Sequence, residues 1–407
     1  MEKIELLSPA GDMEKLKTAL YFGADAVYVG GKNFSLRALA GNFTNDELIE
    51  AVKYTHERNK KIYVTVNVFA RNNEIEPAEK YFKFLEEIEV DGVIISDPGL
   101  IYVCSSVAPK LKINVSTQAN SLNYKTVEFY KTLGVTRVIL ARELSINEIQ
   151  TIIEKVPGME IETFVHGAMC ISMSGRCLLS DYLTDRSANR GACVQACRWN
   201  YQIREVNSNG NFLDMEEDGH GTYILNSKDL NLLDEIDALY SAGVCSLKIE
   251  GRMKSEYYLA TVINAYRRAI DEFYAIGSEY KNNPLFQAEL NKTAHREFTK
   301  GYFFGKNDRT VNYTDSQSKG THKYIANVLD YDSEKGFATV EMRNRFKVGD
   351  VLEVLSPNDS FLQKITVEKM QDEKGKDVND AKLVQQRLRL YTAVPLASGD
   401  ILRIEEE

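Results

Sequence analysis

Residues 92–118 read GVIISDPGLIYVCSSVAPKLKINVSTQ, and this stretch holds the pattern that decides the fold. It opens with a short run rich in β-branched residues at 92–95 and closes with a second such run at 112–115. Between them, Asp97-Pro98-Gly99 puts Pro at the first position of a helix, where its missing N–H does no harm. The stretch therefore predicts a strand, a helix and a second strand in succession.

The same alternation extends over the first 277 residues. Two of the helical stretches have clear N-terminal signals, namely Thr44 before two acids, and Ser145 with Glu148 at capping-box spacing. Eight strands, each followed by a helix, predict an α/β fold with a TIM-like (β/α)8 barrel over 1–280. A doubly wound open sheet is the alternative, but no Gly-rich dinucleotide motif follows the first run. The apolar runs occupy residues 4–7, 26–29, 61–68, 92–95, 112–115, 136–140, 161–165 and 246–249.

Charged side chains follow three of the predicted strands, at the end where such a barrel keeps its active site. Arg142 and Glu143 follow the sixth run, His166 ends the seventh, and Glu250 and Arg252 follow the eighth. The two arginines predict an anion clamp, because a guanidinium binds carboxylate or phosphate through two N–H groups. The carboxylates and the histidine are candidate acids or bases, with pairing between carboxylates and arginines as the plainer alternative.

Four cysteines lie close together in an insertion after the seventh run, at 168–226. They follow the spacing Cys170-x6-Cys177-x15-Cys193-x3-Cys197. Thiolates are soft ligands, and four of them can hold a tetrahedral zinc ion or an iron–sulfur cluster. The six-residue first gap fits zinc ribbons poorly, which favours iron–sulfur over zinc. Buried cysteines without a metal are a third reading.

The insertion is long for a connection in a barrel. Long loops in compact domains are usually functional, so we expect it to build or cover a site at the rim. Its remainder predicts a hairpin of 200–206 with 222–225, and then a helix over about 229–242.

A nucleophilic cysteine is an alternative use of the same segment. His166 lies four residues before Cys170, and a thiolate beside an imidazolium is how cysteine hydrolases are activated. The histidine fits equally well a local hydrogen-bonding role that orients the cysteines. Cys104, within a predicted helix, and Cys245, entering a strand, are expected in the core.

Arginines are frequent in the insertion and could bind a dicarboxylate or an RNA backbone. A solvated surface with Asp181 and Asp185 as partners is an equal alternative. Trp199, beside Cys197, is expected to pack rather than to stack on a base. The arginines are Arg176, Arg186, Arg190, Arg198 and Arg204.

The chain changes character after a last barrel helix at 255–276. Residues 281–320 are polar with one helical stretch, and we expect them to connect two domains. From 321 to 407, short alternating segments with Gly or Asp turns predict a small all-β barrel. The segments are 324–328, 337–342, 350–355, 363–370, 388–393 and 400–404.

Composition bounds the class of protein. The 407 residues carry 50 Lys plus Arg against 59 Asp plus Glu, a net charge of −9, which argues against coating nucleic acid by charge alone. No apolar run approaches the roughly 20 residues of a membrane helix, and the N-terminus lacks a signal-peptide core. We expect a cytoplasmic protein with no membrane partner. Six cysteines in such a chain are not a disulfide framework.

The stretches ETFVHGAMC at 162–170 and SGRCLLS at 174–180 resemble the collagenase-like peptidase family U-32. The likeness extends from LSPAG at 7–11 to KIEGR at 248–252. It continues through REFTKG at 296–301 into the C-terminal part, so it covers nearly the whole chain. The family's peptidase name is historical, and the resemblance implies hydroxylation of RNA or quinones without dioxygen.

By length and C-terminal domain, the chain is similar to the branch that forms 5-hydroxyuridine at the tRNA wobble position in a prephenate-dependent reaction. Related branches of the family are similar to proteins of ribosomal RNA cytidine hydroxylation and of anaerobic ubiquinone biosynthesis. In these branches, four cysteines hold a [4Fe–4S] cluster. Cys170, Cys177, Cys193 and Cys197 match those positions. The resemblance implies tRNA, through its anticodon region, and prephenate as partners, and it leaves a related second subunit open.

Three hypotheses follow. The first is a tRNA hydroxylation enzyme in which Arg142 and Arg252 hold a prephenate-like dicarboxylate, and the C-terminal β domain binds tRNA through basic spots at 343–347 and 387–389. The second is a peptidase that uses Cys170 and the nearby histidine. The third is a non-catalytic carrier of a cluster or of zinc that serves a partner enzyme.

Overall fold

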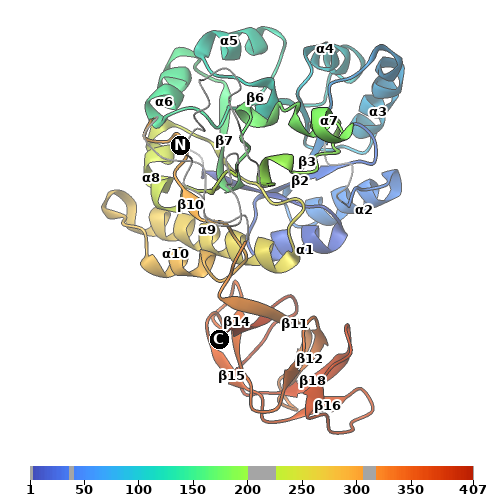
Figure 1. Cartoon of the computed structure of the whole chain (residues 1–407), viewed down its shortest axis with the longest axis vertical. Coiled ribbons are helices and arrows are strands. Elements are labelled where there is room, and N and C mark those ends of the chain that lie inside the picture. Colours follow the sequence, from blue (N-terminus) through green and yellow to red (C-terminus); the bar gives the residue numbers. More distant parts are fainter. Residues whose placement is uncertain (1–2, 36–40, 200–225, 306–317, 407) are drawn as a thin grey trace, which may run out of the picture. The chain divides into compact units, whose positions relative to one another are not determined.

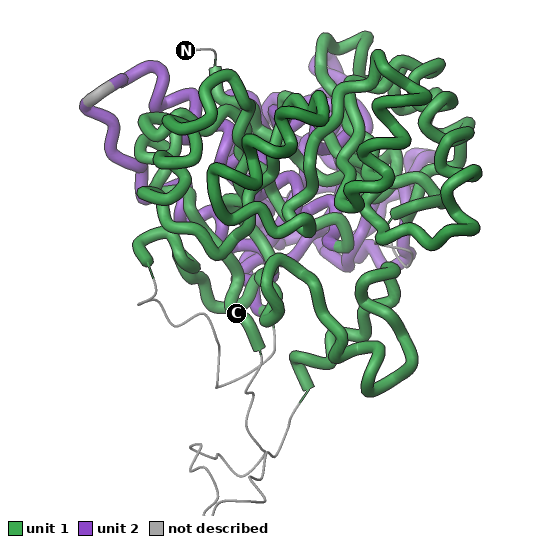
Figure 2. Tube along the Cα trace, turned by 90° about the horizontal axis from the view of Figure 1, so that it is seen from above, with its two compact units in different colours: residues 1–16, 25–253, 295–318 green, residues 17–24, 254–294, 319–407 purple. Residues whose placement is uncertain are grey.

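The computed structural model describes residues 3–35, 41–199, 226–305 and 318–406. The chain divides into two compact units, which Figure 2 shows in different colours. Unit 1 comprises residues 1–16, 25–253 and 295–318, and unit 2 comprises residues 17–24, 254–294 and 319–407. The cysteine insertion described below belongs to unit 1, and the C-terminal β-strands belong to unit 2.

Within the described residues, eight parallel strands of unit 1 form a closed ring. Each strand pairs with the next along the chain, and β9 pairs with both β7 and β1, which closes the barrel. The eight predicted runs and the TIM-like fold are confirmed. The strands are β1 (Glu5–Pro9), β2 (Ala26–Gly30), β3 (Lys61–Val66), β4 (Gly92–Ile95), β5 (Ile113–Val115), β6 (Arg137–Ile139), β7 (Glu160–Ala168) and β9 (Ser246–Ile249).

Helices alternate with these strands along the chain, and in unit 1 they lie outside the ring (Figure 1). The predicted starts are confirmed, because Thr44 Oγ1 accepts the Glu47 N–H at 3.2 Å and Glu148 accepts the Ser145 N–H at 2.8 Å. The carboxylate of Asp97 caps the helix that begins at Pro98. The helices are α1 (Met13–Tyr21), α2 (Asn45–His56), α3 (Ile75–Glu87), α4 (Pro98–Val107), α5 (Tyr124–Thr132), α6 (Ile146–Lys155), α8 (Ile236–Ala242) and α9 (Glu256–Ile276), with one-turn helices η1 (Asn72–Glu74), η2 (Thr117–Ala119), η6 (Leu233–Glu235) and η7 (Gly277–Glu279).

A buried charge network fills the N-terminal end of the barrel interior. Arg137 lies 2.5 Å from Glu5 and 3.0 Å from Glu162, and Lys248 lies 2.8 Å from the other oxygen of Glu162. Burial alone would raise the pKa of Glu5, but the positive charge of Arg137 holds it below its usual value. Opposite charges are paired here because an unpaired buried charge is costly. This network therefore holds the strands together at the end away from the rim.

The segment after the cysteine insertion differs from the prediction. We expected a helix from residue 229, but Asp229–Asn231 forms a strand, β8, that runs antiparallel to β7, and the helix begins at Ile236. A second short strand, β10 (Phe298–Thr299), pairs with β8. The buried carboxylate of Asp229 binds Arg296, next to β10, which fixes this extension of the sheet. A contact across that sequence distance leaves no local signal.

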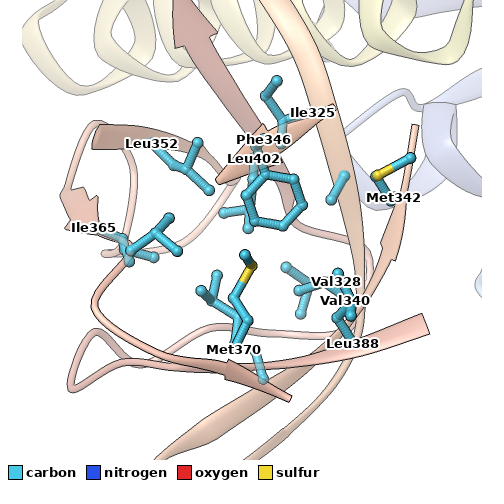
Figure 3. Close-up of a cluster of buried hydrophobic side chains, with 14 of the residues drawn as sticks. Ile325, Val328, Val340, Met342, Phe346, Leu352, Ile365, Met370, Leu388 and Leu402 are labelled. Carbon is cyan, nitrogen blue, oxygen red and sulfur yellow. The ribbon is translucent and has the colours of Figure 1, made fainter. Parts of the chain in front are cut away.

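In unit 2, the described C-terminal residues form an antiparallel sheet that curls around one apolar core (Figure 3). The all-β prediction is confirmed, but the single run expected at 363–370 is two strands, and a separate pair, β13 (Phe346–Lys347) with β17 (Asp380–Ala381), was not predicted. The helix α10 (Pro284–Leu290) precedes the sheet. Its strands are β11 (His322–Asp332), β12 (Phe337–Met342), β14 (Val351–Leu355), β15 (Lys364–Thr366), β16 (Met370–Asp372), β18 (Arg387–Tyr391) and β19 (Ile401–Glu405).

Candidate functional site

The four clustered cysteines lie on residues 168–199, which follow β7 and which we call the cysteine segment. Because β7 ends at the C-terminal rim of the barrel, the segment starts where such barrels keep their active sites (Figure 1). Its elements are short helical turns: η3 (Met173–Gly175), α7 (Leu179–Thr184), η4 (Ala188–Arg190) and η5 (Ala196–Arg198). Cys170 follows β7, Cys177 precedes α7, Cys193 follows η4, and Cys197 lies in η5. The predicted hairpin of 200–206 with 222–225 lies outside the described residues.

The four thiols of the segment influence one another electrostatically. Burial raises the pKa of Cys197, and the thiols of Cys170, Cys193 and Cys177 raise it further, while Arg198 opposes them. The thiols of Cys170, Cys177 and Cys193 therefore lie near enough to Cys197 to affect it, and all four are free thiols. By contrast, the Cys104 thiol is fully buried in the core, as predicted.

Backbone N–H groups point at two of the sulfur atoms. Leu179 donates to Cys177 Sγ and Gln195 donates to Cys193 Sγ, each at 3.3 Å. Asn189 fixes the first of these cysteines, because its side chain accepts the Cys177 N–H at 3.2 Å and donates to the Cys177 carbonyl at 2.9 Å. N–H groups aimed at sulfur stabilise thiolates and tune the potentials of iron–sulfur clusters.

Glu143 holds the turn between the first two cysteines. Its carboxylate accepts the Ser174 N–H and the Ser174 hydroxyl, each at 2.6 Å. Ser174 is buried with φ at 44°, a left-handed conformation that is unfavourable for a residue with a side chain. Two charge-assisted hydrogen bonds offset that strain. Its contacts make Glu143 a residue that positions the cysteine segment, and its role as an acid or base stays a prediction.

We predict that Glu143→Ala loosens this turn. Loss of both bonds to an ionised group should make the Ser174 amide exchange with solvent about 10- to 100-fold faster, which hydrogen-exchange mass spectrometry would measure. Glu148→Ala is the matched control, because Glu148 caps α6 at Ser145 instead. Unchanged protection of Ser174 in Glu143→Ala would contradict the assignment.

Arg142 binds the start of the same segment. Its Nη1 donates to the Ala168 carbonyl at 2.8 Å, and its guanidinium lies over the Phe164 ring, 5.0 Å from the centroid. Its backbone N–H donates to Ser174 Oγ. The described residues provide no other hydrogen-bond or ion-pair partner for this half-buried side chain.

Other arginines of the segment contact neighbouring rim loops rather than Asp181 and Asp185. Arg176 donates to the Gln118 carbonyl at 2.7 Å, and Arg190 lies 2.6 Å from Glu74. Arg186 is exposed. The prediction of aspartate partners is therefore wrong for the first two, because contacts to loops after β3 and β5 are not visible in local sequence. Arg204 lies outside the described residues.

Arg252 lies inside the barrel mouth, 3% exposed. Its guanidinium donates to Ser35 Oγ at 2.8 Å, to Thr65 Oγ1 at 3.4 Å and to the side chain of Asn42. Gly30 lies directly beneath it, where any side chain would collide with the guanidinium. Arg252 thus connects the loop after β2 to strand β3. Arg142 instead binds the start of the cysteine segment, so the two arginines contact different parts of the rim.

The structure places His166 and Glu250 side by side on the barrel wall. The Glu250 N–H donates to the His166 carbonyl at 2.8 Å. The imidazole is 1% exposed and packs against Phe298, whereas the Glu250 carboxylate accepts the Tyr28 hydroxyl at 3.2 Å. The Lys248 ammonium lies over the Tyr28 ring, 4.4 Å from its centroid, and Tyr28 is a site residue that the sequence did not reveal.

The Trp199 side chain is 44% exposed, so the expectation that it packs is wrong. The backbone becomes extended at this residue, where η5 ends.

In the C-terminal unit, Arg345 pairs with Asp380 and Arg387 lies near Glu341. These carboxylates reduce the positive charge expected of the basic spots at 343–347 and 387–389.

No three His, Cys, Asp or Glu side chains within 3–35, 41–199, 226–305 and 318–406 are arranged to hold a metal ion. No helix in the same ranges is long and apolar enough to span a membrane.

Comparison with known proteins identifies the family. The model of peptidase family U32 matches residues 11–313, and that of the U32 C-terminal domain matches 320–403. The chain belongs to peptidase family U32. It is 41% identical to tRNA hydroxylation protein P1 of Bacillus subtilis, over 94% of this chain and 90% of that one. It is 36% identical to tRNA hydroxylation protein P of Escherichia coli, over 98% and 92%. It is also 31% identical to a collagenase of Porphyromonas gingivalis, over 89% of each chain.

Proposed function

We propose that this U32 protein is a tRNA hydroxylation enzyme that converts the wobble uridine to 5-hydroxyuridine without dioxygen. The observation that carries the proposal is the gathering of four free thiols at the rim of the barrel. The relatives with tRNA hydroxylation in their names match nearly the whole chain, so both units are included in the comparison. Replacing the C5–H of uridine by C5–OH removes two electrons from the base, so prephenate, which the family resemblance implies as co-substrate, is also the proposed two-electron oxidant.

Cys170, Cys177, Cys193 and Cys197 would hold a [4Fe–4S] cluster. The donor set fits in kind, because cysteine thiolates are the ligands of such clusters and two of these thiols already accept backbone N–H groups, although no three of them are arranged around one metal position in the described residues. When bound, such a cluster supplies one-electron redox chemistry. The chain's own part is to fix the thiols, through Glu143 at Ser174 and Asn189 at Cys177.

Arg142 is the proposed carboxylate site for prephenate. One N–H of its guanidinium is bound to Ala168, two residues before Cys170, and stacking on Phe164 fixes the plane of the group. A guanidinium held in this way retains N–H groups for a carboxylate oxygen. Arg252 is bound to three uncharged oxygen atoms and would support the mouth rather than clamp the ligand.

The test begins with anaerobic purification of the full chain and measurement of iron, acid-labile sulfide, zinc and the visible spectrum. We expect about four irons and four sulfides per chain, lost in Cys177→Ala but retained in Cys245→Ala. Cys245 is the matched control, because its thiol donates to the Ile161 carbonyl, outside the cysteine segment. Stoichiometric zinc without iron would overturn the cluster.

Activity is then measured as oxygen added to uridine, by mass spectrometry of nucleosides after incubation with tRNA and with or without prephenate as the oxidant. Formation of 5-hydroxyuridine by the wild-type protein, and its loss in Cys177→Ala, supports the proposal. A purified, iron-loaded protein that restores no product, although the same gene restores it in cells, would make the chain a carrier for a partner enzyme. Cleavage of denatured collagen that survives in Cys177→Ala but not in Cys170→Ser would instead favour a peptidase.

A further inference from the structure

Large apolar side chains are unusually exposed on the cysteine segment. Of eighteen exposed large hydrophobic residues in the described part of the chain, six lie between residues 171 and 199. Single exposed hydrophobic residues need no explanation, but a group of them indicates an interaction site. The six are Ile171 (36% exposed), Met173 (51%), Leu178 (71%), Tyr182 (86%), Leu183 (41%) and Trp199 (44%), and we call them the apolar surface of the segment.

These side chains alternate with the proposed cluster ligands along the segment, and α7 contacts η5, the turn that contains Cys197. Leu178 follows Cys177 directly, and Tyr182 and Leu183 lie on α7, between the second and third cysteines. Cys193 is itself exposed. α7 is held in place by Ser180, whose buried hydroxyl accepts the Val194 N–H at 3.1 Å. A molecule that covers the apolar surface therefore lies beside the thiols.

The charge of the segment indicates which kind of molecule would bind. Residues 168–199 contain four arginines against two aspartates, although the whole chain has a net charge of −9. Arg186 lies two residues after Thr184, which ends α7, and it is exposed with no ion-pair partner in the described residues. A segment that carries an exposed tyrosine, an exposed tryptophan and an exposed arginine suits single-stranded RNA, whose bases stack on aromatic rings and whose phosphates bind arginine.

We infer that the apolar surface of the cysteine segment binds unpaired bases of an RNA loop, with Arg186 on the backbone. This inference rests on the proposed function, and it deepens it by placing the anticodon loop on the barrel unit rather than on the C-terminal unit. The basic spots of that C-terminal unit have carboxylate partners, which agrees with this assignment. Stacking beside the thiols would hold the target uridine out of its loop at the reacting end of the barrel.

Binding is tested with the iron-loaded full chain and a fluorescent anticodon stem-loop, by anisotropy at several salt concentrations. Tyr182→Ala should weaken binding about 5- to 100-fold, as expected for loss of one stacked base. Arg186→Gln should weaken it and make the dependence on salt shallower. Tyr102→Ala is the matched control, since Tyr102 is 69% exposed on α4, and its removal should change nothing.

Iron content and the circular dichroism spectrum show that each variant is folded. Wild-type affinity in both Tyr182→Ala and Leu178→Ala would overturn the inference. The inference would also be overturned if these variants bound RNA normally but no longer hydroxylated it. The surface would then contact a partner protein rather than RNA. The proposed function is tested separately, by whether the wild-type protein hydroxylates uridine at all.

Discussion

Gly167→Ala is expected to destabilise the barrel by about 3 kcal/mol or more, because two separate costs add at this position. Gly167 has φ at 106°, a conformation that side chains rarely adopt. A Cβ there would lie 3.0 Å from the carbonyl carbon of Glu250 and closer still to its oxygen. Since the obstacle is backbone, β7 and β9 must separate where the barrel closes.

Gly134→Ala separates the two costs. Gly134 also has positive φ, at 77°, but a Cβ there meets no atom within 4 Å. This variant should therefore lose only about 1 kcal/mol, from conformational strain. Urea unfolding followed by circular dichroism measures both variants against the wild type. Equal losses would show that the contact with Glu250 is relieved by a small shift, contrary to our expectation.

The second large effect is expected in unit 2, where Arg403→Leu should cost about 3–5 kcal/mol of unfolding free energy. Arg403 on β19 is fully buried, and its Nη2 lies 2.6 Å from Glu289 on α10 and 2.6 Å from Glu353 on β14. Leucine leaves two buried carboxylates, both still paired with Lys292, while His322 lies 3.9 Å from Glu353. The helix and the sheet of this unit should then separate more easily.

Arg345→Leu is the control for a lost ion pair at the surface. Arg345 is 65% exposed and pairs with Asp380, so its removal should change the unfolding free energy by less than about 1 kcal/mol. Denaturant titrations of both variants, monitored by circular dichroism, give the comparison. A loss in Arg403→Leu no larger than in Arg345→Leu would mean that Lys292 alone neutralises the carboxylates.

The same network has a predictable dependence on pH. Burial would raise the pKa of Glu353, but Arg403 and Lys292 hold it below its ordinary value of 4.5. A lowered carboxyl pKa gives stability above the unfolded pKa that is lost as the pH falls through the folded one. Without Arg403 this pKa should rise, so the difference between Arg403→Leu and wild type should be largest near neutral pH and shrink below about pH 4.5.

Much of the barrel could be predicted because its signals are local. Each barrel strand is a run of three to nine residues, and each helix start depends on side chains within about three residues, as at Thr44, Asp97 and Ser145. The clustering of four cysteines is likewise a property of one short segment. The same reasoning failed at β8, whose position depends on Asp229 binding Arg296, far along the chain.

What the sequence alone determined is therefore the number and order of the barrel elements, the all-β character of the C-terminal part, and the set of candidate thiol ligands. The tertiary structure decided what the rim residues do. It brought Glu143 to Ser174 and Arg142 to Ala168, tied Arg252 to Ser35, and exposed Trp199. The physical reason is that secondary structure follows from neighbours in sequence, whereas the partner of a charged rim residue is set by closure of the barrel, which brings distant loops together.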